Sequence, residues 1–455
     1  MIQTWIKKWI ARIQNSTFIK SVLTLSAGVV VSQAIALLVT PVVSRLYTPE
    51  IMGESTIIVS NSAIIGTLLS IGLMTAIMLP EDDAEAKGLC RLMTKIIVIG
   101  STLLYVLAML IAGEWKLFSV SIGYGWACAM LWATVVLNNL VNICYGYVNR
   151  QKMYGVLFWN PTLGTASCAV IRILLGLMGC GLWGHMGGML ASEVIILIHM
   201  LRHANPFRGR IEHSSRSLLV KYKDFPCVLL PSDLVGKVSS ELPTLLFDRF
   251  WGSFALGSYS MCMTILKLPT KFLAAPVNRV FYREATERVN RGENIGEFAF
   301  SLVKANTKIA LIPIMMVVIW GRWLFAFVLG PEWADAGDYA SIMSFYVLLA
   351  FCASCLSGKF VIIGQKKTIL WINVVVLITN AIVFVVSHWL NFTAPVTIML
   401  FSVVGGLVSL MDLTIFMKQT RVSLSRFFMF SFQYLLIPMV VGIVGNMVFR
   451  QLIPC

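Results

Sequence analysis

Five charged residues lie inside two neighbouring apolar stretches near the middle of the chain. Asp233, Lys237 and Glu241 recur at intervals of four residues in the first stretch, and Lys267 and Lys271 are four residues apart in the second. Residues four apart lie on the same face of an α-helix. The pattern therefore predicts two helices that each carry one charged face.

The two stretches predict an antiparallel hairpin of membrane-spanning helices that turns near Gly252. Its arms cover residues 225–251 and 253–278, which brings Lys237 level with Lys267 near the middle of the bilayer. A charge that faces lipid at that depth costs on the order of 2.5–3.5 kcal/mol. We therefore expect the charged side chains to face one another or a water-filled cavity. Proline kinks a helix, and four prolines interrupt the arms: Pro231, Pro243, Pro269 and Pro276.

The charge balance of the hairpin defines what such a cavity would attract. Asp233 comes level with Lys271, and lysines outnumber carboxylates by one, so the cavity is expected to attract anions. Lysine binds an anion as a point charge without a rigid grip. The alternative is a set of structural ion pairs that locks the hairpin. With two polar residues of the first half added, the predicted substrate-binding set is Lys237, Lys267, Lys271, Asp233, Glu241, Gln33 and Arg172.

Three carboxylates within the predicted apolar spans are candidates for binding a proton or a cation. They are Asp233 and Glu241 in the hairpin and Glu193 in the first half of the chain. Glu193 is predicted at the same depth as Arg172. The alternative for these two residues is a single buried ion pair.

Further lysines lie near the predicted cytoplasmic ends of spans. Lys20, Lys304 and Lys308 are candidates for admitting substrate on that side, and the alternative is that their ammonium groups simply extend to the membrane surface. Lys359 and Asp412 lie deeper in their spans, although Lys359 is close enough to an inner end to reach the surface as well.

Composition places the chain among polytopic membrane proteins. It has 455 residues, of which 58% are hydrophobic and 13% are charged, whereas soluble domains carry roughly 25% charged residues. The net charge of +15 does not indicate nucleic-acid binding, because the basic residues lie in short loops between apolar spans. No phosphate-binding glycine loop, catalytic triad or metal-ligand spacing is present, so we expect neither an enzyme nor a bound metal or cofactor.

The apolar runs predict thirteen spans, since about 20 residues cross a bilayer. Basic residues concentrate in alternate loops, which puts the N-terminus in the cytoplasm. The predicted domains are an amphipathic segment at 1–17, a six-helix lobe at 18–203, a basic cytoplasmic loop at 204–224, a second six-helix lobe at 225–417 and an extra span within 418–455. The predicted spans are 18–44, 54–79, 93–113, 117–147, 156–181, 184–203, 225–251, 253–278, 301–328, 339–364, 368–390, 394–417 and 427–449.

A short internal repeat relates the two predicted lobes. The same three residue types occur at matching positions in both halves, each time at a predicted outer turn. Arg45, an aromatic residue and Gly53 in the first half correspond to Arg249, an aromatic residue and Gly257 in the second, with one constant difference in residue number. The same difference in residue number aligns Gln33 with Lys237 of the hairpin. Because both copies occupy the same place in a six-span series, the lobes are predicted to run in the same direction across the membrane, as in transporters built from parallel repeats.

Four runs of sequence resemble a known family: "LTLSAGVVVSQAIALLVTPVVSRLYTPEIMGESTI", "LPEDDAEA", "LKLPTKFLAAPVNRVFYREATE" and "LGPEWADAGDYASIMS". They are similar to the polysaccharide-repeat flippases, of O-antigen or Wzx type, in the multidrug/oligosaccharidyl-lipid/polysaccharide exporter superfamily. The resemblance implies an all-α bundle of two six-helix lobes around a central cavity that opens to each side in turn. It also implies an undecaprenyl-diphosphate-linked oligosaccharide as substrate. Some relatives couple transport to a gradient of protons or sodium ions, and Asp233, Glu241 and Glu193 are the candidates for that role. A thirteenth span departs from the simplest twelve-span pattern of that family.

These observations lead to the hypothesis of a flippase in the bacterial inner membrane that serves the biosynthesis of a surface polysaccharide such as O-antigen lipopolysaccharide, capsule or exopolysaccharide. The expected partners are the lipid-linked oligosaccharide, membrane lipids and other membrane proteins of polysaccharide assembly, and no nucleic acid. A multidrug or small-cation exporter of the same superfamily is one rival, and it predicts a cavity dominated by carboxylates. A membrane polymerase or ligase would need a sizeable outer loop, and a non-transporting scaffold would show a fully packed central interface.

Overall fold

The computed structural model describes residues 17–111, 121–208 and 214–452. The predicted amphipathic segment at 1–17 lies almost wholly outside these residues, and so does the start of the predicted span at 117–147. Within the described part all regular elements are helices, and there is no strand. The first-half elements are α2 (Thr17–Leu46), α3 (Pro49–Ser70), α4 (Asp83–Ile111), α5 (Tyr124–Arg150), α6 (Tyr154–Leu177), α7 (Gly181–His203) and α8 (Ser215–Lys221).

The second half begins with α9 and ends with α17. Its elements are α9 (Leu230–Leu266), α10 (Ala275–Asn290), α11 (Gly296–Leu329), α12 (Ala334–Cys355), α13 (Lys359–Ile362), α14 (Lys366–Trp389), α15 (Ala394–Gln419), α16 (Leu424–Ser431) and α17 (Ile437–Leu452). Three π-helical turns lie at Phe225–Leu229, Thr270–Ala274 and Phe432–Leu436, and two 3-10 turns at Thr75–Met78 and Pro331–Trp333.

Eleven helices of the described residues are long and apolar enough to cross a membrane. They correspond to eleven of the thirteen predicted spans, which confirms an all-α polytopic membrane protein. The two predicted spans outside this set are the hairpin arms, whose charged residues lower their hydropathy. The second predicted span was wrong at its end, because Ile71 and Gly72 adopt left-handed backbone with φ of 44° and 69° and α3 stops at Ser70.

The described helices divide into two compact units. Unit 1 contains residues up to Tyr47 and Ile57–Val238, and unit 2 contains Thr48–Thr56 and everything from Ser239 onward. The basic loop predicted at 204–224 lies within unit 1, while the chain passes between the units inside α3 and inside α9. The predicted lobe limits therefore stay a prediction.

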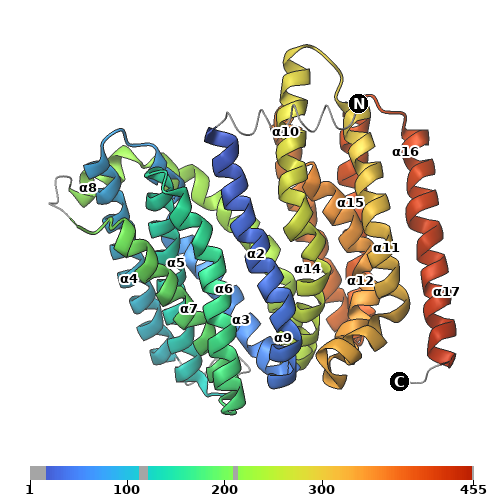
Figure 1. Ribbon diagram of the computed structural model, residues 1–455, viewed down its shortest axis with the longest axis horizontal. Helices are drawn as coiled ribbons and strands as arrows, with labels where there is room; N and C mark the ends of the chain where they lie inside the picture. The colour runs from blue at the N-terminus through green and yellow to red at the C-terminus, as the bar shows by residue number, and fades with distance from the viewer. Residues whose placement is uncertain (1–16, 112–120, 209–213, 453–455) are drawn as a thin grey trace. The chain divides into compact units, whose positions relative to one another are not determined.

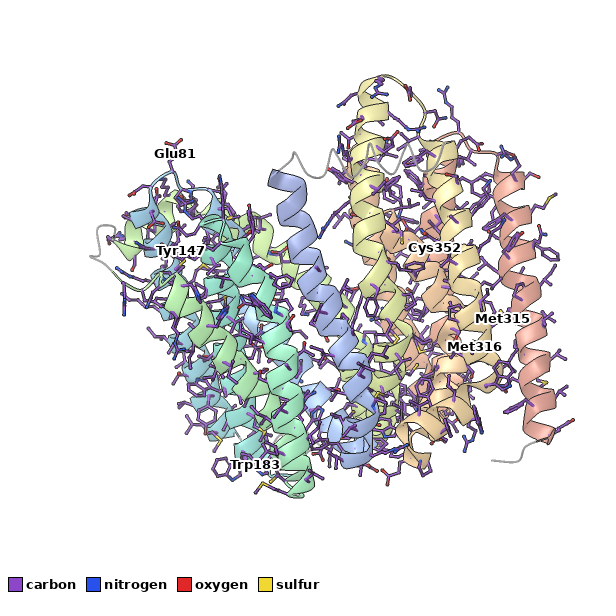
Figure 2. The ribbon with its side chains drawn as sticks, in the orientation of Figure 1. Glu81, Tyr147, Trp183, Met315, Met316 and Cys352 are labelled. Atoms are coloured by element: carbon purple, nitrogen blue, oxygen red, sulfur yellow. The ribbon has the colours of Figure 1, made fainter. Side chains whose placement is uncertain are left out.

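Unit 1 is a bundle in which α6 packs against α2 and α7, and α5 packs against α4 and α7 (Figure 1). A core of fully buried aliphatic side chains, including Leu73, Leu89 and Ile143, stabilises the end of the bundle near α8. Glu81 lies at that end and Trp183 at the opposite end (Figure 2). The turn that contains Glu81 thus marks one end of the bundle, and an aromatic side chain marks the other.

In unit 2, α12 lies between α11 and α15, with α14 on α15 and α17 on α11 (Figure 1). Its core is rich in phenylalanine, and Phe281, Phe351 and Phe416 are fully buried there. The rod formed by α16, a π-helical turn and α17 runs from the end of the unit where α10 lies to the other end.

Repeat-related glycines meet where α3 crosses the second arm of α9. A Cβ atom on Gly53 would lie 1.9 Å from the carbonyl oxygen of Ser253, and a Cβ atom on Gly257 would lie 1.7 Å from that of Pro49. The two contacts are equivalent under the internal repeat. The difference in residue number that relates Gly53 to Gly257 also relates Pro49 to Ser253. Only glycine lets the backbones approach this closely. The predicted internal repeat therefore corresponds to a local pseudo-two-fold contact within unit 2.

Repeat-related aromatic residues also make matching hydrogen bonds. The Tyr47 hydroxyl donates to the carbonyl oxygen of Arg172 at 2.7 Å in unit 1. The Trp251 indole nitrogen donates to the carbonyl oxygen of Phe392 at 3.0 Å in unit 2. In each half, the C-terminal end of the first helix is thus fixed to the backbone of a later element.

Candidate functional site

The charged hairpin turns at Gly252, as predicted. This glycine has φ 80° and ψ 176°, a conformation available almost exclusively to glycine, and it interrupts α9. The rings of Phe247 and Tyr259 on either side of the turn have centroids 5.4 Å apart, whereas twelve residues of continuous helix would separate them by about 18 Å. The two arms are therefore antiparallel next to the turn.

Lys267 and Lys271 lie where the second arm loses regular helical geometry. α9 ends at Leu266, and a π-helical turn covers Thr270–Ala274. Pro269 has no N–H to continue the helix, which accounts for the irregular backbone. Both lysine side chains are exposed, and the N–H of Lys271 donates to the carbonyl oxygen of Lys267 at 3.0 Å. π-Helical turns occur frequently at functional sites.

Three of the five charged hairpin residues lie in unit 2, namely Glu241, Lys267 and Lys271. Glu241 is half-buried and is close enough to Lys267 to attract it electrostatically, while Lys271 repels Lys267. Among these three residues, two ammonium groups stand against one carboxylate. The second arm itself, residues 253–278, contains these two lysines and no carboxylate, so its charge is positive.

Asp233 and Lys237 lie on the part of α9 that belongs to unit 1. The Asp233 side chain is exposed and that of Lys237 is half-buried, and a π-helical turn at Phe225–Leu229 precedes them. Their levels relative to Lys267 and Lys271 stay a prediction, because α9 passes from unit 1 to unit 2 after Val238.

The predicted pairing of Arg172 with Glu193 was wrong. The Arg172 guanidinium donates through Nε to the carbonyl oxygen of His185 at 3.0 Å. The Glu193 carboxylate interacts with Asn138, and its Oε2 atom is buried with no hydrogen-bond partner among the described residues. The turn between α6 and α7 lies at 178–180 instead of 181–184, so His185 faces Arg172 and Glu193 lies about 12 Å further along α7. Roles of Arg172, Glu193 and the half-buried Gln33 toward substrate or ions stay predictions.

Two of the three lysines predicted to admit substrate contact aromatic rings. The ammonium group of Lys304 lies 4.4 Å from the centroid of the Phe300 ring. The ammonium group of Lys308 lies 5.2 Å from the centroid of the Tyr434 ring. Such cation–π contacts stabilise the packing of α11. The side chain of Lys20 lies outside the described part of the chain.

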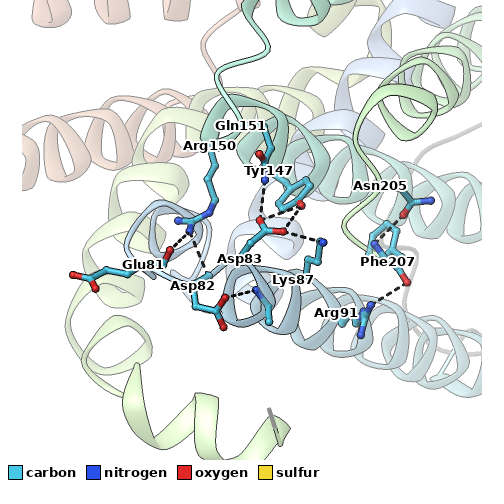
Figure 3. A network of polar contacts seen from close by, with 11 residues as sticks. Glu81, Asp82, Asp83, Lys87, Arg91, Tyr147, Arg150, Gln151, Asn205 and Phe207 are labelled. Atoms are coloured by element: carbon cyan, nitrogen blue, oxygen red, sulfur yellow. Dashed lines mark hydrogen bonds and ion pairs between the residues drawn. The ribbon is translucent and has the colours of Figure 1, made fainter. Parts of the chain in front are cut away.

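A polar network joins the start of α4 to the end of α5 (Figure 3). The Asp83 carboxylate accepts hydrogen bonds from Gln151 Nε2 at 2.8 Å and from the Tyr147 hydroxyl at 3.1 and 3.2 Å, and it forms an ion pair with Lys87 at 2.9 Å. A carboxylate in the first turn of a helix also interacts favourably with the helix dipole. Asp83 is thus held by three side chains.

Arg150 fixes the turn that precedes α4. Its guanidinium donates to the carbonyl oxygens of Ile77 at 3.4 Å, Glu81 at 3.3 Å and Asp82 at 3.4 Å. Within the described residues its partners are all backbone carbonyls, which are uncharged. The positive charge of Arg150 therefore has no ion-pair partner there.

Next to this network, Glu85 ties α8 to α4. Its carboxylate accepts hydrogen bonds from Lys221 Nζ at 2.5 Å and from the Tyr222 hydroxyl at 3.1 Å. The hydrogen bond to Glu85 raises the pKa of Lys221, and burial together with the Glu85 carboxylate raises the pKa of Tyr222. Both groups therefore stay protonated at neutral pH, and the basic loop is fixed to the bundle at this point.

A pocket of about 650 Å³ opens beside the network, between the 3-10 turn before α4 and the connection from α5 to α6. Its lining combines two cations, two amides, a carboxylate, a phenol and a thioether: Met78, Asp83, Asn149, Arg150, Gln151, Lys152 and Tyr154. Sequence reasoning did not find this pocket. The available signal was the acidic run before one span and the basic residues after the next, since both lie at the same membrane face.

A buried ion pair in unit 2 was also not predicted as a pair. Lys359 Nζ lies 2.7 Å from Asp412 Oδ2, with side chains 7% and 15% exposed. Gly358, with φ 81°, separates α13 from α12 and directs Lys359 inward. The expectation that Lys359 extends to the membrane surface was therefore wrong.

Comparison with known proteins identifies the family. The family model described as polysaccharide biosynthesis protein matches residues 42–338, well over half of the chain. The chain belongs to the polysaccharide biosynthesis protein family. No curated protein sequence matches this family member.

Solved structures show the fold of this polysaccharide biosynthesis protein. The lipid II flippase MurJ in an inward closed conformation matches with a TM-score of 0.66 and 13% identity, over 94% of this chain and 98% of that chain. An inward-facing multidrug resistance MATE family transporter of the MOP superfamily matches with a TM-score of 0.57 and 16% identity, over 87% and 93%. A MOP superfamily transporter from Pyrococcus furiosus matches with a TM-score of 0.53 and 14% identity, over 88% and 96%. The protein has the fold of MOP superfamily transporters.

Proposed function

We propose that this protein is a flippase which moves undecaprenyl-diphosphate-linked oligosaccharide repeat units from the inner to the outer leaflet of a bacterial cytoplasmic membrane. It works by alternating access, without covalent chemistry, in the assembly of a surface polysaccharide. Membership of the polysaccharide biosynthesis family supports the pathway. The likeness in fold to a protein named as a lipid II flippase supports the transport of a lipid-linked substrate.

The observation that carries this proposal is the pair of exposed lysines in the broken second arm of the hairpin. A diphosphate and its sugars cannot cross hydrocarbon unaided, because burying their charges and hydroxyls is too costly. Lys267 and Lys271 offer positive charge within an apolar stretch, and Glu241 offsets only one of them. The excess positive charge suits a diphosphate, and the lack of a rigid bidentate grip suits its release.

The rival function is export of drugs or small cations, which the likeness to MATE transporters favours. A cation-binding cavity needs an excess of carboxylates, and the second arm has the opposite balance. Under this rival, replacing the lysines with alanine would leave transport intact or improve it. The two functions therefore make opposite predictions for the same variants.

The test is transport in cells that lack the gene. Deletion is expected to cause lipid-linked repeat units to accumulate on the cytoplasmic side, and the wild-type gene is expected to restore export. Lys267→Ala combined with Lys271→Ala is expected to insert normally but to lower export at least tenfold, because one charged hydrogen bond contributes about 1.5–3 kcal/mol. Lys418→Ala, which removes an exposed lysine at the end of α15, serves as the matched control. Normal export by the double variant would refute the assignment of these lysines.

A further inference from the structure

The pocket beside Asp83 lies apart from the hairpin and has the groups that recognise a phosphorylated sugar. It is formed by the connection between α5 and α6 and by the turn before α4, all within unit 1. Its volume of about 650 Å³ falls in the range of small-molecule sites, roughly 300–1,000 Å³. Asn149 and Tyr154 in its wall can donate to and accept from sugar hydroxyls.

The charges around the pocket leave its two cations available. Asp83 is already neutralised by Lys87 and is hydrogen-bonded by Tyr147 and Gln151. Arg150 donates only to backbone carbonyls in the described structure, through bonds of 3.3–3.4 Å that orient the guanidinium. An anion that reached Arg150 would therefore meet a guanidinium that forms no direct ion pair among the described residues, and Asp83 attracts this group only at longer range.

The nearest additional carboxylates face elsewhere. Figure 3 shows that the Glu81 side chain points away from the Arg150 guanidinium. Asp82 Oδ1 accepts the N–H of Ala84 at 3.1 Å, at the start of α4. Neither carboxylate is among the residues that line the pocket.

Lys152 is held at the rim of the pocket by an unusual backbone conformation. Its φ is 56°, in the left-handed region, and its side chain is exposed. The N–H of Lys152 donates to the carbonyl oxygen of Asn149 at 3.0 Å, and the N–H of Tyr154 donates to the carbonyl oxygen of Lys152 at 2.9 Å. This tight turn puts the exposed Lys152 side chain in the same pocket wall as Arg150 and Asn149.

We propose that this pocket binds a diphosphate-linked sugar, the headgroup of the substrate, before translocation. Arg150 and Lys152 contact the phosphates, and Asn149 and Tyr154 contact the sugar. The pocket lies at the end of unit 1 that also carries Glu81, which the positive-inside rule places in the cytoplasm, where such headgroups are assembled. The identity of the ligand rests on the proposed function, whereas binding of phosphate and sugar rests on the pocket itself.

Binding is measured with the whole protein in nanodiscs of zwitterionic lipid, using UDP-N-acetylglucosamine as a soluble diphosphate-sugar probe. Wild-type protein is expected to bind the probe, and inorganic pyrophosphate is expected to compete. Lys152→Glu and Asn149→Ala are each expected to weaken binding about tenfold. Lys418→Glu, which reverses the charge of an exposed lysine in unit 2, is expected to bind as wild type. Arg150→Gln is left as a secondary variant because Arg150 also holds the turn before α4.

Three results would overturn the proposal. The first is wild-type affinity in both Lys152→Glu and Asn149→Ala. The second is equal loss of affinity in the Lys418→Glu control, which would show a general charge effect. The third is competition by phosphatidylglycerol in the nanodisc but not by pyrophosphate, which would identify the pocket as a site for anionic phospholipid. If the probe binds as expected but cells lacking the gene export repeat units normally, the pocket assignment stands and the proposed function fails.

Discussion

At the scale of single residues, the charged side chains fall into two groups, those with a defined partner and those exposed within an apolar stretch. Some charged groups that the bundles bury are held by a defined partner, as Glu85 is in unit 1 and Lys359 is in unit 2. Lys267 and Lys271 differ, because they are exposed within an apolar stretch whose backbone is irregular. Conformational stability is expected to depend on the first group and transport on the second.

The pair formed by Lys359 and Asp412 allows a test of the first group. Removing one partner of a buried ion pair leaves an uncompensated charge, which costs about 3–5 kcal/mol. Lys359→Met and Asp412→Leu are each expected to lower the melting temperature of the purified protein markedly. The double variant is expected to recover most of the loss, because both charges are then absent.

The control for this comparison of single and double variants is Lys367→Met, at an exposed position near the start of α14. Its effect is expected to stay within about 0.5 kcal/mol. Additive losses in the double variant would contradict a direct interaction between Lys359 and Asp412.

At the scale of elements, the hydropathy of the sequence predicted the membrane spans well. Predictions of which side chains pair across helices, made from residue spacing, were less successful. The eleven apolar helices follow from runs of about 20 residues, and the turn at Gly252 followed from a glycine between two apolar stretches. The direction in which each helix presents its side chains is set by tertiary packing. A shift of the turn between α6 and α7 by a few residues was enough to separate Arg172 from Glu193.

The network around Asp83 could not be predicted for a related reason. Its members come from turns whose conformations depend on contacts between distant segments, such as Arg150 with the carbonyl oxygens of Ile77 and Glu81. Sequence patterns indicated that these charged residues lie at the same membrane face. They did not indicate which residues form hydrogen bonds or ion pairs with one another. The hairpin charges were easier to find, because a regular spacing of four within an apolar run is itself unusual.

The crossing of α3 with the second arm of α9 gives a prediction at this scale. Gly53→Ala and Gly257→Ala would each place a methyl group within 2 Å of a backbone oxygen that cannot rotate away. Overpacking of this kind costs about 1–3 kcal/mol or more. Both variants are expected to lower the melting temperature of the protein in detergent and to loosen the crossing, which protease susceptibility near residues 47–56 would report.

Gly155→Ala is the matched control, because a Cβ atom at Gly155 in α6 meets nothing within 4 Å. This variant is expected to be neutral or slightly stabilising, since alanine favours the helix over glycine by about 0.5–1 kcal/mol. Equal stability of all three alanine variants would show that the close backbone approach at the crossing does not matter.

At the scale of the whole molecule, the distribution of charge predicts the orientation in the membrane. The chain has a net charge of +15, and its basic residues gather in alternate loops, such as the turn between α10 and α11 that contains Arg291. Because basic loops remain in the cytoplasm, that turn is expected inside and the turn between α11 and α12 outside.

Glu293 and Glu332 provide a matched pair for testing this orientation, since both are exposed glutamates in turns at the two ends of α11. In a background without native cysteines, Glu332→Cys is expected to react with a membrane-impermeant maleimide in intact cells. Glu293→Cys is expected to react only after the membrane is permeabilised. Labelling of Glu293→Cys in intact cells would reverse the orientation. The pocket beside Asp83 would then open outside, where it could not receive a headgroup made in the cytoplasm.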